Sequence, residues 1–200
     1  MATLTVIGAG SYGTSLAIVV ASKGVDVLLL ARSEEKAQLL EKDRENKKYL
    51  KDIKFPETLH VTSSIEKALQ HSSVILVAVP SMAFRKTIES LVPFLTSEHK
   101  ICFATKGLEL GSAKFLSQVC SEILPKNFPL SAISGPTFAR ELALNMPTAI
   151  AIAGNNDISF SGRILPAGVP LLQPRYRSRN RRICTATGTH PRIYGKRFGN

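Results

Sequence analysis

The sequence has few cysteines, no long hydrophobic run and no recognisable leader. Its three cysteines, Cys102, Cys120 and Cys184, lack the paired spacing of a zinc site or a disulfide framework. The longest apolar stretches, such as Val74–Pro80, are shorter than the ~20 residues that cross a bilayer. The N-terminus has neither a basic segment nor a cleavage signal. We therefore expect no membrane span and a reducing, cytoplasmic setting.

Acidic residues are absent from the C-terminal end, where the positive charge gathers. The formal net charge is +11, but the last acidic residue is Asp157, and nine of the 26 lysines and arginines lie from Arg163 onward. A basic tail argues for nucleic-acid binding much less than a basic body would. The tail also resembles no nucleic-acid-binding module. Non-specific phosphate neutralisation by the arginines therefore ranks last among the functions considered.

Apolar runs typical of buried strands alternate with helical segments over residues 1–162, and no internal repeat is visible. We expect strands at Thr3–Ile7, Val25–Leu30, Ser73–Val79, Lys100–Ala104, Leu130–Ser134 and Thr148–Ala153. We expect helices at Thr14–Ser22, after Ser33, and at Ser64–Gln70, Met82–Leu91, Ser112–Leu124 and Phe138–Leu144. Residues 41–60 are expected to form a connecting loop. This alternation predicts an α/β fold with a doubly wound, Rossmann-type parallel sheet.

The composition changes over residues 163–200, which contain four prolines and clustered arginines but show no helical or alternating periodicity. We expect a basic Pro/Arg-rich tail without regular structure. Two interpretations stay open. The tail is a basic arm, or it is a segment foreign to the preceding sequence, such as a reading-frame change would produce.

The run from Gly8 to Gly13 reads Gly-Ala-Gly-Ser-Tyr-Gly and lies between the first expected strand and helix. In that setting the G-x-G-x-x-G pattern is a dinucleotide-binding fingerprint. Gly8 permits the tight turn, Gly10 lets the backbone approach a pyrophosphate, and Gly13 lets the helix pack closely on the sheet. The helix N-terminus then offers N–H groups to the phosphates. The alternative is a glycine-rich turn that binds no ligand.

The end of the second strand bears on the choice between NAD and NADP. An acidic residue there binds a free ribose 2′-hydroxyl, whereas an arginine nearby suits a 2′-phosphate. The strand ends in Leu30-Ala31-Arg32, without an acid. Arg32 therefore favours NADP, although it could instead pair with Glu35 or stack on adenine.

Two further strands end in polar groups. Lys106 follows the strand at Lys100–Ala104, and Gly135 and Thr137 follow Leu130–Ser134. Ligands of open parallel sheets bind beyond the carboxyl ends of the strands, so these residues are candidates for substrate contacts. The alternatives are a surface loop lysine and an ordinary helix cap.

The histidines and acids offer no obvious catalytic centre. His60, His71 and His99 lie in polar surroundings, where we expect surface residues rather than catalytic bases. No metal-ligand cluster is visible, so we expect no metal.

The motifs named above occur in a fixed order with Ala78-Val79-Pro80-Ser81, Thr105-Lys106-Gly107-Leu108-Glu109 and Pro147-Thr148-Ala149. Together, over about residues 1–162, they resemble bacterial NAD(P)-dependent glycerol-3-phosphate dehydrogenase. The resemblance implies hydride transfer between the nicotinamide and the pair dihydroxyacetone phosphate and sn-glycerol 3-phosphate, for glycerophospholipid synthesis. It also implies cofactor contacts by Ser11, Tyr12, Arg32, Lys106 and Ala139, and substrate contacts by Lys106, Gly135 and Thr137.

The chain departs from this family after its dinucleotide domain. The family places a general-base lysine in a Gly-Ala-Leu-Lys-Asn-type segment and continues into an all-helical domain, but no lysine lies between Lys126 and Lys196. We therefore identify no catalytic residue and expect weak turnover or none. The alternative function is a non-catalytic dinucleotide-binding module. Apolar surface left uncovered predicts association into homo-oligomers.

Overall fold

The computed structural model describes residues 2–135, 138–146, 148 and 150–154. The strands are β1 (Thr3–Ile7), β2 (Asp26–Leu30), β3 (Leu59–Thr62), β4 (Val74–Val77), β5 (Lys100–Phe103), β6 (Leu130–Ser134) and β7 (Ala151–Gly154). The helices are α1 (Ser11–Ala21), α2 (Glu34–Asp43), α3 (Ile65–His71), α4 (Ser81–Leu91), the 3-10 turn η1 (Val92–Phe94), α5 (Leu116–Ile123) and α6 (Ala139–Ala143). The expected tail at 163–200 lies outside the described residues, as does Cys184.

The strands form one seven-stranded sheet in the order β3-β2-β1-β4-β5-β6-β7. The first six are parallel, which confirms the expected doubly wound sheet. Strand order reverses beside β1, which pairs with β2 on one side and β4 on the other. Such a reversal opens a crevice beyond the carboxyl ends of the two strands.

The last strand corrects the prediction of a wholly parallel sheet, because β7 runs antiparallel to β6. Apolar residues predict a strand but not its direction, so the sequence pattern could not show this reversal. The connection carries α6, which packs against α1, and β7 then pairs with β6 at the edge of the sheet, Ser134 opposite Ala151 and Ser131 opposite Gly154.

Three local expectations were wrong. Strand β3 lies partly within the expected loop at 41–60; it is short, and only Leu59 of its residues is fully buried. Helix α1 begins at Ser11, inside the glycine motif, with Gly10 as its N-cap. Helix α5 begins at Leu116 rather than Ser112, because Leu108 and Phe115 form an antiparallel bridge that leaves residues 109–114 as a loop.

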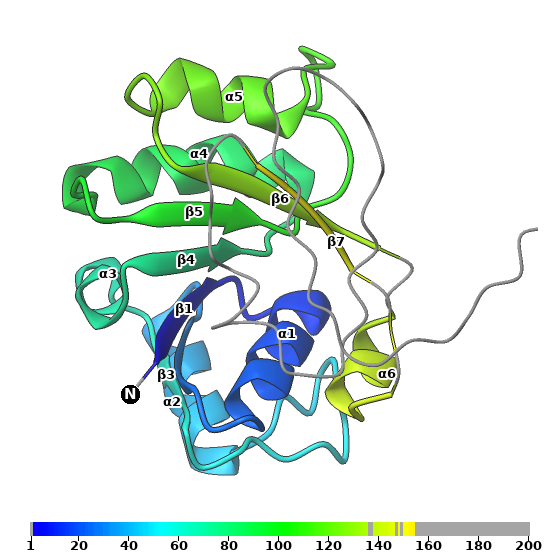
Figure 1. Cartoon of the computed structure of the whole chain (residues 1–200). Helices are drawn as coiled ribbons and strands as arrows, with labels where there is room; N and C mark the ends of the chain where they lie inside the picture. Colours follow the sequence, from blue (N-terminus) through cyan, green and yellow to red (C-terminus); the bar gives the residue numbers. More distant parts are fainter. Residues whose placement is uncertain (1, 136–137, 147, 149, 155–200) are drawn as a thin grey trace, which may run out of the picture.

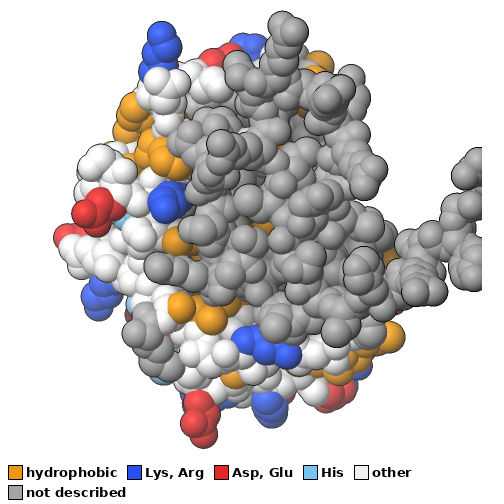
Figure 2. Space-filling view, in the orientation of Figure 1, with side chains coloured by type: hydrophobic (Ala, Val, Ile, Leu, Met, Phe, Trp, Pro, Cys, Tyr) orange, Lys and Arg blue, Asp and Glu red, His pale blue; other side chains and the backbone are white. Residues whose placement is uncertain are grey.

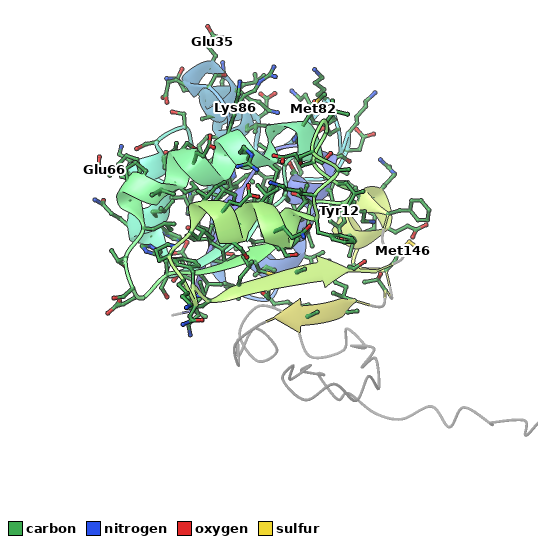
Figure 3. The ribbon with its side chains drawn as sticks, turned by 90° about the horizontal axis from the view of Figure 1, so that it is seen from above. Tyr12, Glu35, Glu66, Met82, Lys86 and Met146 are labelled. Atoms are coloured by element: carbon green, nitrogen blue, oxygen red, sulfur yellow. The ribbon has the colours of Figure 1, made fainter. Side chains whose placement is uncertain are left out.

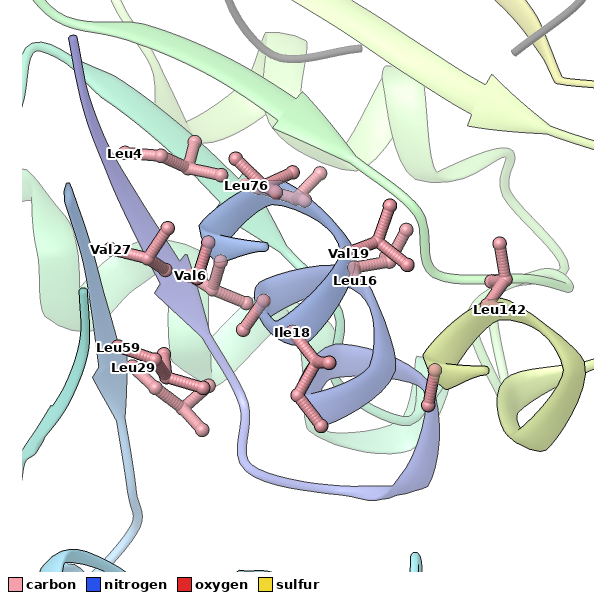
Figure 4. Close-up of a cluster of buried hydrophobic side chains, with 14 of the residues drawn as sticks. Leu4, Val6, Leu16, Ile18, Val19, Val27, Leu29, Leu59, Leu76 and Leu142 are labelled. Carbon is pink, nitrogen blue, oxygen red and sulfur yellow. The ribbon is translucent and has the colours of Figure 1, made fainter. Parts of the chain in front are cut away.

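Two hydrophobic clusters cover the two faces of the sheet. Helices α3, α4 and α5 lie on one face and helices α1 and α6 on the other (Figure 1). Nine of the eleven residues of α1 are buried, which fits a helix that is apolar on nearly every side. Leu16 and Val19 of this helix pack in one cluster with Leu4 and Leu76 of the sheet and Leu142 of α6 (Figure 4).

His99 corrects another expectation, because it is only 6% exposed. The backbone N–H of Thr96 donates to its Nδ1 at 2.8 Å, and its Nε2 lies 3.0 Å from the Leu69 carbonyl oxygen. Nδ1 thus accepts from the backbone while Nε2 faces a carbonyl oxygen, so both ring nitrogens have partners within the fold. His99 therefore holds the turn before β5 rather than lying at the surface.

Charges of both signs are dispersed over the described surface. Where side chains are coloured in Figure 2, both Lys or Arg and Asp or Glu groups lie near the margin of the face shown. This distribution agrees with the near balance of 17 basic and 15 acidic residues in the first 162. Within the described part of the chain, no helix combines the length and apolarity that a bilayer crossing requires.

Candidate functional site

The three glycines of the motif are required for different reasons. Gly8 has φ +115°, and a Cβ there would lie 2.6 Å from the Ala78 carbonyl oxygen. A Cβ at Gly13 would lie 1.9 Å from the Gly8 carbonyl oxygen, so α1 could not pack against the loop. A Cβ at Gly10 would meet nothing within 4 Å. Gly8 and Gly13 thus shape the loop, while the space beside Gly10 is open to a ligand.

The first turn of α1 faces this open space. Gly10 has an extended conformation and no side chain to cap the helix, and no acidic residue occupies the first turn. The first intrahelical bond runs from the Thr14 N–H to the Gly10 carbonyl at 3.0 Å. The amides of the first turn of an α-helix point along its axis, here from the end that begins at Ser11 toward the space beside Gly10. These amides and the helix dipole favour an anion at this position.

Two residues that the sequence reasoning missed hold the loop from outside. Asn46, only 2% exposed, donates to the Thr14 hydroxyl at 2.8 Å and to the Ala9 carbonyl at 3.3 Å. Lys36 of α2 donates to the same Ala9 carbonyl at 2.7 Å. An Asn in a polar segment and a Lys on an amphipathic helix carry no local sign of this role. Only the tertiary structure brings them to the loop.

A group of cations lies beyond β2. Lys36 and Lys48 place their ammonium groups 5.1 and 5.5 Å from the centre of the Tyr49 ring. Burial lowers the pKa of Lys36, and repulsion by Arg32 and Lys48 lowers it further. Among the described residues, Arg32, Lys36 and Lys48 form no ion pair, so the alternative pairing of Arg32 with Glu35 is not found. In the part of the chain that the structure describes, this end of the site is therefore electropositive.

The other end of the site is formed by segments after β1, β5 and β6. The Lys106 ammonium lies 5.3 Å from the centre of the Tyr12 ring and 3.5 Å from the Gly135 carbonyl oxygen. Tyr12 lies at the side of the molecule toward which the arrow of β6 points, whereas Glu66 of α3 lies at the opposite side (Figure 3). The structure thus brings Tyr12, Lys106 and Gly135 together at the carboxyl edge of the sheet.

Of the two remaining residues expected at the site, the structure describes one, Ala139. Ala139 is the first residue of α6, where it is partly buried against the cluster that contains α1. Thr137 lies outside the described residues, so its expected substrate contact stays a prediction.

The described part of the chain offers no reactive centre of another kind. No cluster of three or more His, Cys, Asp and Glu side chains suited to a metal occurs within it. Burial raises the pKa of the Cys102 thiol to about 12, with Ser131 opposing the shift slightly, and burial also raises that of Cys120 to about 12. Both are therefore protonated at neutral pH and unsuited to nucleophilic chemistry. Among the described residues around the glycine loop and Lys106, none is a histidine or carboxylate placed as a general base.

A mostly parallel sheet with a glycine loop at its strand-order reversal defines a Rossmann-type dinucleotide-binding domain. Comparison with known proteins specifies it further. Residues 3–159 match the model of the NAD-dependent glycerol-3-phosphate dehydrogenase N-terminus. The chain belongs to this family.

Similar proteins include full-length members of the family. A glycerol-3-phosphate dehydrogenase [NAD(P)+] of Vibrio campbellii is 49% identical over 150 residues, which cover 75% of this chain and 44% of that protein. The crystal structure of the Coxiella burnetii glycerol-3-phosphate dehydrogenase matches with a TM-score of 0.80 at 33% identity, over 87% of this chain and 54% of that one. The chain thus spans about half the length of the relatives it matches.

Proposed function

We propose that this chain binds NAD(P)(H) along the carboxyl edge of its sheet, with the pyrophosphate over Gly10 and the first turn of α1. Two observations support this proposal. Nothing lies within 4 Å of a Cβ added at Gly10, and the first-turn amides of α1 point into that space. Gly8, Gly13 and the pair Asn46 and Lys36 hold that loop, so binding requires little reorganisation. Ser11 and Tyr12 flank the pyrophosphate position, as the family resemblance implies.

We further propose NADP(H) as the preferred form. Arg32 and Lys48 lie beyond β2, where a 2′-phosphate of the adenine ribose would be placed, and β2 ends without an acidic residue. The pKa of Lys36 is lowered by burial and then by repulsion from Arg32 and Lys48, because the three cations lie close together. An anion there would relieve the repulsion.

At the nicotinamide end we propose that Lys106, Gly135 and Thr137 bind dihydroxyacetone phosphate or sn-glycerol 3-phosphate. The bound nicotinamide would supply or accept the hydride. The Lys106 ammonium is a suitable donor to a substrate oxygen, and Ala139 lines the site at the start of α6. Because no lysine lies between Lys126 and Lys196 to act as base, this chain is expected to turn over weakly. A binding module without catalysis is the second candidate.

Fluorescence titration of the chain with NADPH and with NADH tests the binding proposal, and Gly10→Ala is the decisive variant. Its Cβ fits the loop, so its melting temperature should match the parent, while its affinity should fall about tenfold or more because the methyl occupies the pyrophosphate position. Absence of binding to either nucleotide by the folded parent chain would overturn the proposal. Oxidation of NADPH on addition of dihydroxyacetone phosphate would separate an enzyme from a binding module.

A further inference from the structure

The loop after β5 carries Lys106 and is tied to the helices on one face of the sheet. Arg85 of α4 forms a bidentate pair with Glu109, with Nε and Nη2 at 2.6 and 3.1 Å from the two carboxylate oxygens. The same Nη2 donates to Glu122 of α5 at 2.7 Å, and the Ser112 hydroxyl donates to Glu109 at 2.5 Å. Lys114 also pairs with Glu122. Bidentate geometry within a network distinguishes this pair from an ordinary surface ion pair.

Hydrophobic burial does not hold this loop. Leu108, Leu110 and Phe115, its large apolar side chains, are 46%, 80% and 66% exposed. Ala113 has φ +54°, which a residue with a side chain adopts only where other contacts hold it, and the flexible Gly107 and Gly111 add no rigidity of their own. Loop geometry therefore depends on polar contacts, and the Glu109 side chain, only 14% exposed, lies at their centre.

Lys106 lies between two anchors of this loop. On one side the Thr105 hydroxyl donates to the Val79 carbonyl at 2.8 Å. On the other side, three residues along, Glu109 is held by Arg85. Lys106 itself is exposed, and its flexible stem is not confined by packing. Its ammonium is held by the Tyr12 ring and the Gly135 carbonyl, and it reaches both only while the loop keeps the Lys106 backbone at this end of β5.

We propose that the Arg85–Glu109 pair positions Lys106 for the dinucleotide, so that Arg85 is a positioning residue although it touches no ligand. This proposal rests on the proposed function for the role of Lys106, but the holding of the loop does not depend on any ligand. The two can therefore be tested separately.

The first test asks whether the Arg85–Glu109 pair holds the loop, and it measures amide hydrogen exchange over residues 105–115 without ligand. In Arg85→Met we expect exchange about tenfold faster in this segment, because a local opening no longer has to break the pair. Exchange in the strands β1 and β4 should not change. Lys86→Met, which removes a charge from the next position of α4 without touching the network, is the matched control. Unchanged exchange over 105–115 in Arg85→Met would overturn the proposal even if no nucleotide bound.

The second test asks whether Arg85 affects nucleotide binding through Lys106. It titrates NADPH into Arg85→Met, Lys106→Met and the double variant. Arg85→Met should weaken binding about fivefold, and the double variant should bind no more weakly than Lys106→Met, because Arg85 acts through Lys106. Arg85→Lys should restore only part of the affinity, since a lysine cannot form the bidentate pair. Additive losses in the double variant would show a merely structural role. Failure of the parent chain to bind NADPH would contradict the proposed function. The exchange result would still show whether Arg85 holds the loop.

Discussion

The Asn46 side-chain amide donates a 2.8 Å hydrogen bond to the hydroxyl of Thr14, and both residues are almost fully buried. This bond joins the segment after α2 to the first turns of α1. The same amide reaches the Ala9 carbonyl at 3.3 Å. One side chain thus connects the glycine loop to a segment that is distant in the sequence.

Asn46→Ala should therefore loosen the loop. The buried Thr14 hydroxyl would lose its donor, and the Ala9 carbonyl would keep only Lys36; an unpaired buried polar group typically costs about 1–3 kcal/mol of the free energy of unfolding. NADPH affinity should fall as well, because the loop would no longer be held in the binding conformation. Urea unfolding and nucleotide titration measure the two effects. Gln70→Ala, at an exposed position of α3 away from the glycine loop, is the control. Equal stability of Asn46→Ala and the parent chain would contradict this role.

Gly13→Ala should disrupt the fold itself, in contrast to Gly10→Ala. The added methyl carbon would lie 1.9 Å from the Gly8 carbonyl oxygen, so α1 and the loop would have to separate. We expect a loss of roughly 3 kcal/mol or more in the free energy of unfolding, as for severe overpacking. Thermal melting of the two variants side by side is the measurement. A Gly13→Ala variant as stable as Gly10→Ala would show that the loop is more tolerant than its geometry indicates.

The Glu109 carboxylate should give the chain a characteristic acid sensitivity. Its pairing with Arg85, supported by Ser112, lowers its pKa from 4.5 to about 2. The charged form is therefore favoured by folding, so its stabilisation is complete above pH ~5 and is lost as the pH falls from about 4.5 toward 2.

Urea midpoints measured between pH 6 and pH 2.5 test this for the parent chain and for Glu109→Gln. The parent should start with the higher midpoint and lose more of it on acidification, because the glutamine variant has no carboxylate to protonate. Glu122 shares Arg85 with Glu109, so Glu122→Gln measured over the same pH range separates its contribution from that of Glu109. Parallel midpoint curves would exclude a stabilising role for the pair.

Cofactor preference should depend on the cations beyond β2. Arg32→Gln and Lys48→Gln should each weaken adenosine 2′,5′-bisphosphate about tenfold while changing 5′-AMP little, because only the former carries the 2′-phosphate. Calorimetric titration with the two nucleotides measures the ratio. Lys23→Gln, an exposed lysine beyond the C-terminal end of α1, is the control. If the substitutions changed both nucleotides equally, the 2′-phosphate would lie elsewhere.

Much of the architecture could be predicted because it is encoded locally. The strands β1 and β6 have the expected bounds, and Ser33 caps α2 by accepting from the Lys36 N–H. The strand β3 was missed because a short edge strand buries too little to produce a recognisable run. The reversal of β7 was missed because apolar residues alone do not give a strand's direction.

The sequence by itself determined the class of fold, the glycine loop and the family, since these depend on hydrophobic periodicity and on residues adjacent in the chain. It also indicated Arg32 and Lys106 through their places at strand ends. Only the tertiary structure decided that Lys36 and Asn46 hold the loop and that Arg85 is bound to Glu109. Such contacts join segments far apart in sequence, where polar side chains leave no periodic pattern and become partners only when the sheet brings them together.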